Sequence, residues 1–195
     1  MAIAYPLGMP TVVGFQELNL RARNTVAVSQ SPFTYEQQVH SYDGQMWEVD
    51  VSLPPMNRSN AEEWISFLVA LRGRAGTFLL GDPASVAPQG TATSAVVTGA
   101  LGDSTVFVTM TGSLVAGDYI QLGVGADATL HKVLLTRTGN GDLEIWPKLR
   151  KARASVTAIL TNPKGVFRLI GNTADWNINS ANFYGVSFSA NEVIS

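Results

Sequence analysis

Apolar and polar residues alternate along the start of the chain. In residues 16–23 and again in residues 46–53, every second side chain is apolar or small, and most of those between are charged or polar. This period of two is typical of half-buried β-strands. Shorter strand candidates lie at residues 25–29 and 33–39, and a predicted turn at residues 30–32 separates them.

An Asp-Gly pair marks a second predicted turn. Asp43 and Gly44 lie at the centre of residues 42–45, between two strand candidates. Asp-Gly favours the tight turns that join antiparallel strands. The beginning of the chain is therefore expected to form an antiparallel meander.

One helix is expected, at residues 60–72. Apolar side chains recur there at helical spacing, as in the core-facing stripe of an amphipathic helix. Ser59 with Glu62, or Asn60 with Glu63, fits a capping box at its start. The pattern therefore predicts an α-helix with its own N-terminal signal.

The predicted helix ends at a glycine between two arginines. Gly73 is a natural terminating residue, and Arg72 and Arg74 lie where the negative end of the helix dipole favours cations. A short apolar strand is expected next, at residues 77–80. These arginines also suit contacts with carboxylates of a neighbouring subunit, because a guanidinium binds carboxylates in a forked geometry. They are our candidate subunit-interface residues.

Composition changes in the middle of the chain. Residues 84–100 are rich in Ala, Thr, Gly and Ser, and a glycine-rich turn is expected at residues 138–142. Five short strands at close spacing indicate a small β-barrel similar to an OB fold. The five strand candidates are residues 105–110, 117–122, 130–136, 143–146 and 155–160.

Two further strand candidates, residues 165–170 and 183–190, lie near the end of the chain with a polar loop between them. Two strands are not stable alone, so we expect them to complete the sheet of the first block. The predicted fold is mainly β with one α-helix. Residues 1–85 and 162–195 form a β-sandwich domain, interrupted by an inserted barrel at residues 86–161.

Composition excludes several classes of function. The chain has 46% hydrophobic and 14% charged residues, a net charge of −2 and no cysteine. Lack of cysteine excludes disulfides, thiolate zinc sites and a cysteine nucleophile. The charge balance argues against a nucleic-acid groove, which needs clustered Lys and Arg. No signal-peptide pattern or long apolar run is present, so we expect no membrane insertion.

Candidate catalytic groups are few. His40 and His131 are the only histidines, neither lies in a recognisable motif, and both are interpreted as surface or interface residues. Four acidic residues of the insert lack the spacing of a calcium loop, which favours roles in turns and solubility. They are Asp118, Asp127, Asp142 and Glu144. We therefore expect no catalytic residue, no metal and no cofactor, and the chain is not expected to be an enzyme.

A basic run and three aromatic residues leave alternatives open. Residues 148–153 form the densest basic patch, which suits a phosphate backbone or an acidic partner, although a solvated turn is favoured. Trp146, Trp176 and Tyr184 are candidates for a sugar-binding platform. Because they are spread over different elements, core packing is the favoured interpretation.

The sequence FLVALRGRAGTFLLGDP at residues 67–83 resembles a segment of tail-tip proteins from long-tailed bacteriophages and gene transfer agents. Similarity continues at residues 117–120 (GDYI), at residues 143–147 (LEIWP) followed by Leu149 and Arg150, and at residues 167–169. Within this class the chain is most similar to the distal tail protein. The resemblance covers most of the chain.

The resemblance implies a tail-tube-like β-sandwich with one helix, assembled as a homohexameric ring. Such a ring joins the tail tube to the tail tip or baseplate hub and lets DNA pass through its lumen. The implied partners are the tail tube, tail-tip or hub and tape measure proteins. The implied location is the distal end of the tail in the virion, after assembly in the host cytoplasm. Many distal tail proteins add a larger C-terminal domain for receptor-binding proteins, so an adhesin-holding role is not expected here.

Two other functions remain open. The first is a tail-tube or tube-terminating subunit, whose subunits stack into long polymers. The second is a carbohydrate-binding module for host-surface glycans, in which Trp146 of the insert takes part. The insert weakly favours a ring that is used once, because a bulky decoration on every layer of a tube is less common.

Overall fold

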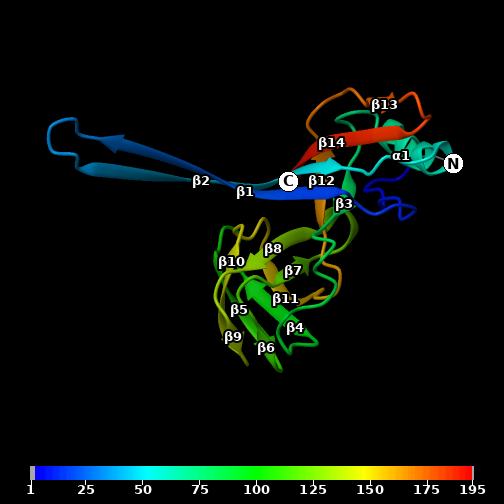
Figure 1. Cartoon of the computed structure of the whole chain (residues 1–195). Coiled ribbons are helices and arrows are strands. Elements are labelled where there is room, and N and C mark those ends of the chain that lie inside the picture. Colours follow the sequence, from blue (N-terminus) through cyan, green and yellow to red (C-terminus); the bar gives the residue numbers. More distant parts are fainter. Residues whose placement is uncertain (1–2, 195) are drawn as a thin grey trace.

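Two β-sheets make up most of the fold (Figure 1). The computed structural model describes residues 3–194. The first sheet, here named the main sheet, has the strand order β1-β2-β14-β12-β3, with β13 paired to β14. The second sheet, here named the barrel, has the order β11-β4-β5-β10-β8-β7, and β6 pairs with β9 in a separate ribbon. The prediction of a mainly β chain with one helix is confirmed.

The main sheet combines strands from both ends of the chain. Its strands are β1 (Glu17–Gln30), β2 (Gln37–Ser52), β3 (Phe78–Leu80), β12 (Gly165–Leu169), β13 (Trp176–Ile178) and β14 (Tyr184–Glu192). Strand β14 pairs antiparallel with β2, which adds the end of the chain to the sheet of its beginning. The polar loop expected between the last two strands contains β13, which pairs with β14 from Trp176 to Ile178.

The helix α1 (Arg58–Ala70) packs against one face of the main sheet. Trp64, Leu68 and Leu71 are almost completely buried, and the Trp64 ring lies 6.3 Å from that of Phe188 in β14. Burying such side chains contributes roughly 1.5–3 kcal/mol each to folding. The apolar stripe that predicts the helix is therefore the surface that joins it to the sheet.

The predicted capping boxes are wrong. The N-cap is Asn57, whose side-chain oxygen accepts a hydrogen bond from the backbone N–H of Asn60 at 3.1 Å. The helix begins earlier than expected, so Ser59 and Asn60 lie inside it. It also ends at Ala70 rather than at residue 72, because Arg72 and Gly73 adopt left-handed φ angles of 52° and 62°.

Gly73 has a structural requirement for glycine. A Cβ atom there would lie 2.8 Å from the Cα of Asn172. The positive φ angle adds to this, since only glycine adopts it without strain. The helix end is therefore fitted closely against the loop that follows β12.

The barrel is a nearly closed sheet with its own core. Its strands are β4 (Ala95–Gly99), β5 (Thr105–Met110), β7 (Tyr119–Leu122), β8 (Thr129–Val133), β10 (Gly141–Trp146) and β11 (Arg153–Ala158). The ribbon strands are β6 (Ser113–Leu114) and β9 (Arg137–Thr138), and a short 3-10 helix covers Gly125–Asp127. Gln121 and Ile159 exchange two backbone hydrogen bonds of 3.0 and 2.9 Å, which link the two ends of the sheet.

The expected barrel is present, but the prediction of five strands is wrong. Strand β4 lies in the segment whose small, polar composition indicated no strand. Ala95 and Val97 of β4 are buried in the barrel core. Its alternation is weak in the sequence because small residues carry little hydrophobic contrast.

Strands β1 and β2 form one long hairpin, so the breaks predicted within them are wrong (Figure 1). The turn that joins them runs from Ser31 to Glu36, where the Ser31 N–H donates to the Glu36 carbonyl at 2.9 Å. Asp43 and Gly44 do not form a turn. They lie inside β2 at a β-bulge, where the register passes from Asn24–Gln45 to Val26–Ser41.

The bulge explains the misleading Asp-Gly signal. Tyr42, Asp43 and Gly44 lie opposite the single residue Thr25. Asp-Gly tolerates the irregular backbone of a bulge as well as that of a tight turn. Long-range pairing on both sides of the bulge decided between the two.

Candidate functional site

The outer part of the long hairpin, residues 26–41, projects away from both sheets and is here named the arm (Figure 1). All of its residues are exposed except Ser31, which is half-buried. Phe33, in the turn at its tip, is 92% exposed. A two-stranded ribbon is at best marginally stable in water, so an arm of this kind needs a further contact.

The two faces of the arm differ. Residues paired across an antiparallel ladder share a face, and Val28 pairs with Val39 while Val26 pairs with Ser41. The opposite face carries the pairs Ala27–His40 and Ser29–Gln38. One face is therefore aliphatic and the other is mainly polar. Uncovered aliphatic side chains gathered on one face mark a protein interaction surface.

The arm carries almost no charge. Its only charged side chain is Glu36 in the turn, and Lys and Arg are absent from it. The arm therefore provides no cation for binding to phosphate groups.

The arm leaves the body beside the end of barrel strand β10. The Trp146 indole N–H donates to Asn24 Oδ1 at 2.8 Å, and the Trp146 ring meets that of Trp47 with centroids 4.5 Å apart. Trp47 in turn donates from Nε1 to the backbone carbonyl of Leu130 in the barrel at 2.9 Å. Trp146 is thus a structural contact between the barrel and the main sheet, not part of an open sugar platform.

The first half of the basic run 148–153 also contacts the hairpin. Lys148 forms a 2.6 Å ion pair with Asp43, and its backbone N–H donates to Gln45 Oε1 at 2.9 Å. Arg150 forms a 2.8 Å ion pair with Glu192 and donates to the Gln45 carbonyl at 2.5 Å. The side chains of Arg150 and Glu192 are only 9% and 3% exposed.

The second half of the run is paired inside the barrel. Lys151 lies 3.0 Å from Asp127, and Arg153, which is buried, also forms an ion pair with that carboxylate. These contacts hold the pKa of Asp127 below its usual value, with the Arg153 hydrogen bond as the main cause. The favoured interpretation of a solvated turn is therefore wrong for Arg150 and Arg153, which are taken up by internal carboxylates.

His131 is buried, so its interpretation as a surface or interface residue is wrong. Nδ1 lies 2.7 Å from the carbonyl of Pro147, which only accepts, and this places the ring proton on Nδ1. Nε2 then accepts from the Thr129 hydroxyl at 2.9 Å. Burial is the main cause that lowers the pKa of His131 to about 4. The ring is a neutral structural group in a closed network.

His40 remains exposed on the polar face of the arm. Its ring meets that of Tyr42 edge to face at 5.2 Å. The structure therefore separates the two histidines, one in the arm and one in the barrel interior.

The acidic residues of the insert do not gather at one site. Asp118 is buried and accepts from the backbone N–H groups of Gln89, Gly90 and Val115 at 2.7, 3.2 and 2.8 Å. It therefore holds two loops together, in keeping with its predicted role in turns. Within residues 3–194, no group of three or more His, Asp or Glu side chains is arranged to hold a metal ion.

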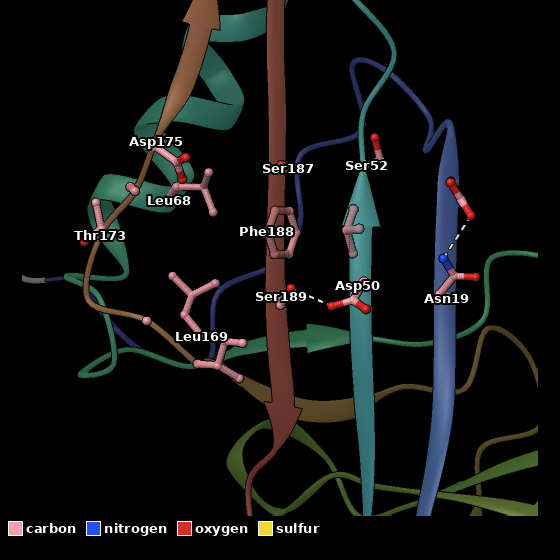
Figure 2. A pocket seen from close by; sticks show the side chains of 15 residues that line it. Asn19, Asp50, Ser52, Leu68, Leu169, Thr173, Asp175, Ser187, Phe188 and Ser189 are labelled. Carbon is pink, nitrogen blue, oxygen red and sulfur yellow. Dashed lines mark hydrogen bonds between the residues drawn. The ribbon is translucent and has the colours of Figure 1, made fainter.

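A hollow of about 480 Å³ lies on the main sheet beside β14 (Figure 2). Leu68 and Leu169 contribute apolar surface to it, and Asp50, Asp175 and Ser189 contribute polar groups. Asp50 already accepts from the Ser189 hydroxyl at 2.5 Å and pairs with Arg21 at 2.5 Å. No histidine or lysine lines the hollow. This lining provides no base of the usual kind beside a nucleophile.

Arg72 and Arg74 lie beyond the end of α1 with exposed side chains. Neither forms an ion pair with any residue in the range 3–194. The backbone N–H of Arg74 donates to Asn172 Oδ1 at 3.2 Å, which holds the segment in place. Both guanidinium groups are thus presented to solvent from a fixed backbone.

The arm is the candidate functional feature that the sequence analysis missed. A signal was present, since Val26, Val28 and Val39 occur in a stretch without Lys or Arg. The predicted turns divided that stretch into short pieces and concealed its continuity.

Comparison with known proteins adds no name to this geometry. No protein-family model matches the chain, and a search of curated proteins finds no relative. In the part of the chain that the structure describes, no helix has both the length and the apolar character needed to cross a membrane.

Proposed function

We propose that the chain is a virion structural protein, the subunit of a distal tail ring that joins a tail tube to the tail tip or baseplate hub. The observation that carries the proposal is the arm, an exposed two-stranded ribbon with an uncovered aliphatic face. The resemblance of residues 67–83 to tail-tip proteins supports the same class of protein.

A second copy of the chain is the proposed partner of the arm. The aliphatic face presents Val26, Val28 and Val39 over adjacent positions of the ribbon. When such a face meets a different surface on the next copy, the contact is heterologous, and it closes into a ring if the rotation permits. The resemblance implies six subunits.

The charge of the arm is compatible with DNA passage. The polar face carries Ser29, Gln38 and His40, and the arm contains no Lys or Arg. A channel that DNA must leave quickly benefits from a lining that does not neutralise phosphates. The proposal includes no sequence-specific nucleic-acid binding, no membrane insertion and no catalytic role.

The proposed partners are the tail tube protein, the hub proteins and the tape measure protein. The proposed location is the distal end of the tail, with assembly in the host cytoplasm. A tail-tube or tube-terminating subunit is the alternative within this class, and filaments in negative-stain images of the purified chain would favour it. A glycan-binding module has less support, because the Trp146 indole N–H is bonded to Asn24.

Oligomeric state tests the proposal. Light scattering coupled to size exclusion, together with negative-stain imaging, is expected to show a closed oligomer. Changing Val28 and Val39 to Asp is expected to give monomers, because carboxylates on the aliphatic face resist burial. The matched control changes Ser29 and Gln38 to Asp on the polar face and is expected to retain the oligomer. A strictly monomeric wild-type chain at high protein concentration would overturn the proposal.

A further inference from the structure

The contacts from the end of β10 to the hairpin meet at the base of the arm. Trp146 donates to Asn24, Lys148 pairs with Asp43, and the Lys148 backbone donates to Gln45. Asn24 and Gln45 are the last pair before the register shift, and Asp43 lies within the bulge. The barrel therefore holds the hairpin on both strands at the point where the ladder is interrupted.

The bulge is the point of the hairpin at which its direction is least determined by its own hydrogen bonds. Three residues of β2 lie opposite one residue of β1, so the regular ladder is broken there. A bulge bends the strand and increases its local twist. Beyond it, the arm has only its own two strands to hold it, since its residues are almost all exposed.

The barrel side of these contacts is firmly anchored. The Trp146 ring packs edge to face on Trp47, whose side chain is in the core of the main sheet. Arg150, two residues beyond Lys148, is held by the buried carboxylate of Glu192 and donates to the Gln45 carbonyl. A support can direct a flexible element only if it is itself rigid, and this one is attached to the same sheet from which the arm emerges.

We propose that the inserted barrel acts as a bracket that fixes the direction of the arm. Trp146 and Lys148 are positioning residues in this role, and Asn24, Asp43 and Gln45 are the positions that they hold. The role assigns a structural function to the insertion and to half of its basic run. It needs neither a glycan nor a nucleic acid.

The bracket has a consequence for assembly that rests on the proposed function. An arm that samples many directions meets a second copy in the binding geometry less often. Fixing its direction beforehand reduces the entropy lost on binding. A chain with a broken bracket is therefore expected to assemble more weakly, although the aliphatic face of its arm is unchanged.

Distance measurements between spin labels test the bracket independently of assembly. The chain has no cysteine, so Ser29→Cys in the arm and Thr109→Cys in the barrel can be labelled selectively. A second pair, Glu63→Cys in α1 with Thr109→Cys, reports the placement of the barrel against the helix. Labelled chains are diluted with excess unlabelled protein, so that only distances within one chain are measured.

The bracket is broken by combining Trp146→Phe, which removes the indole N–H, with Lys148→Met. The Ser29–Thr109 distance distribution is expected to broaden by about twofold or more, because the arm then pivots at the bulge. The Glu63–Thr109 distribution is expected to stay unchanged. The matched control, Lys151→Met, removes a lysine of the same run that pairs with Asp127 rather than with the hairpin, and is expected to leave both distributions unchanged.

A Ser29–Thr109 distribution that stays as narrow as in the wild type overturns the bracket. If the barrel variant unfolds, the combination of Asn24→Ala and Asp43→Asn tests the same contacts from two exposed positions of the hairpin. Broadening in a chain that never assembles would uphold the bracket and remove the proposed ring function. A narrow distribution in a chain that forms rings would do the opposite.

Discussion

The indole rings of Trp47 and Trp146 meet edge to face, with centroids 4.5 Å apart and planes at 87°. Trp47 belongs to the core of the main sheet, and Trp146 ends the barrel strand β10. Tyr119 and Leu130 of the barrel belong to the same apolar cluster. The two sheets are therefore joined by a shared apolar contact as well as by ion pairs.

Trp47→Ala is expected to lower the free energy of unfolding by about 3–5 kcal/mol, because it leaves a cavity between the sheets and removes the donor to the Leu130 carbonyl. Urea denaturation followed by circular dichroism measures this change. Trp176→Ala is the control, since Trp176 is exposed on β13, and it is expected to change stability by less than about 1 kcal/mol. Equal effects of the two substitutions would show that Trp47 does not join the sheets.

Glu192→Gln is expected to lower the free energy of unfolding by about 3–5 kcal/mol, because it leaves the buried Arg150 guanidinium without its counter-charge. Denaturant titration provides the measurement. Glu62→Gln, which breaks the exposed pair with Arg58, is the control and is expected to cost less than about 0.5 kcal/mol. Replacing Arg150 and Glu192 together with Met and Leu is expected to restore much of the loss. A double variant no more stable than Glu192→Gln would argue against charge burial as the cause.

Stability is expected to fall as the pH is lowered from 6.5 towards 4, because His131 is neutral in the folded barrel and its pKa is lowered from 6.5 to about 4. The unfolded chain binds this proton first, so the stabilisation is complete above pH 6.5 and is lost progressively below it. The loss reaches about 3 kcal/mol near pH 4. Arg150 and Arg153 add to the effect by opposing a further positive charge.

His131→Gln keeps a donor and an acceptor in the cavity but removes the titrating group. Its free energy of unfolding is expected to vary much less between pH 6.5 and pH 4 than that of the wild type. His40→Gln on the exposed arm is the control and is expected to retain the wild-type pH dependence. The same slope in His131→Gln and in the wild type would assign the effect to another group.

Changing Arg72 and Arg74 to Glu is expected to leave the monomer folded and to prevent ring formation. Both side chains are exposed and form no internal ion pair in the described part of the chain, so reversing their charge affects only a contact with another subunit. Light scattering measures the oligomer, and circular dichroism verifies the fold. The control changes Arg58 and Lys151 to Glu, which alters the net charge equally. An intact ring in the Arg72 and Arg74 variant would exclude these arginines from the interface.

Several elements of the fold were predictable because their signals are local. The helix follows from Trp64, Leu68 and Leu71 at helical spacing, which became its buried surface. The alternation in residues 46–53 identified the inner half of β2, where Trp47, Val49 and Val51 are buried. The candidate interface arginines were predicted to lie near the helix end, and they do so as exposed residues.

Features that depend on distant partners were not predictable. Arg150 has the sequence environment of a surface turn, yet it is buried against Glu192 from the last strand. His131 has no motif, and its burial depends on Pro147 and on closure of the barrel. Each case requires knowledge of which segments meet in space.

The sequence by itself determined the class of fold and the single helix, because residue periodicity and terminating residues act over a few positions. Only the tertiary structure decided that Asp43 and Gly44 form a bulge, that the hairpin continues into an exposed arm, and that Trp146 and Lys148 hold its base. The physical reason is that an Asp-Gly pair suits a turn and a bulge alike. Pairing with Asn24 and Val26, across the whole length of the hairpin, selects one of them.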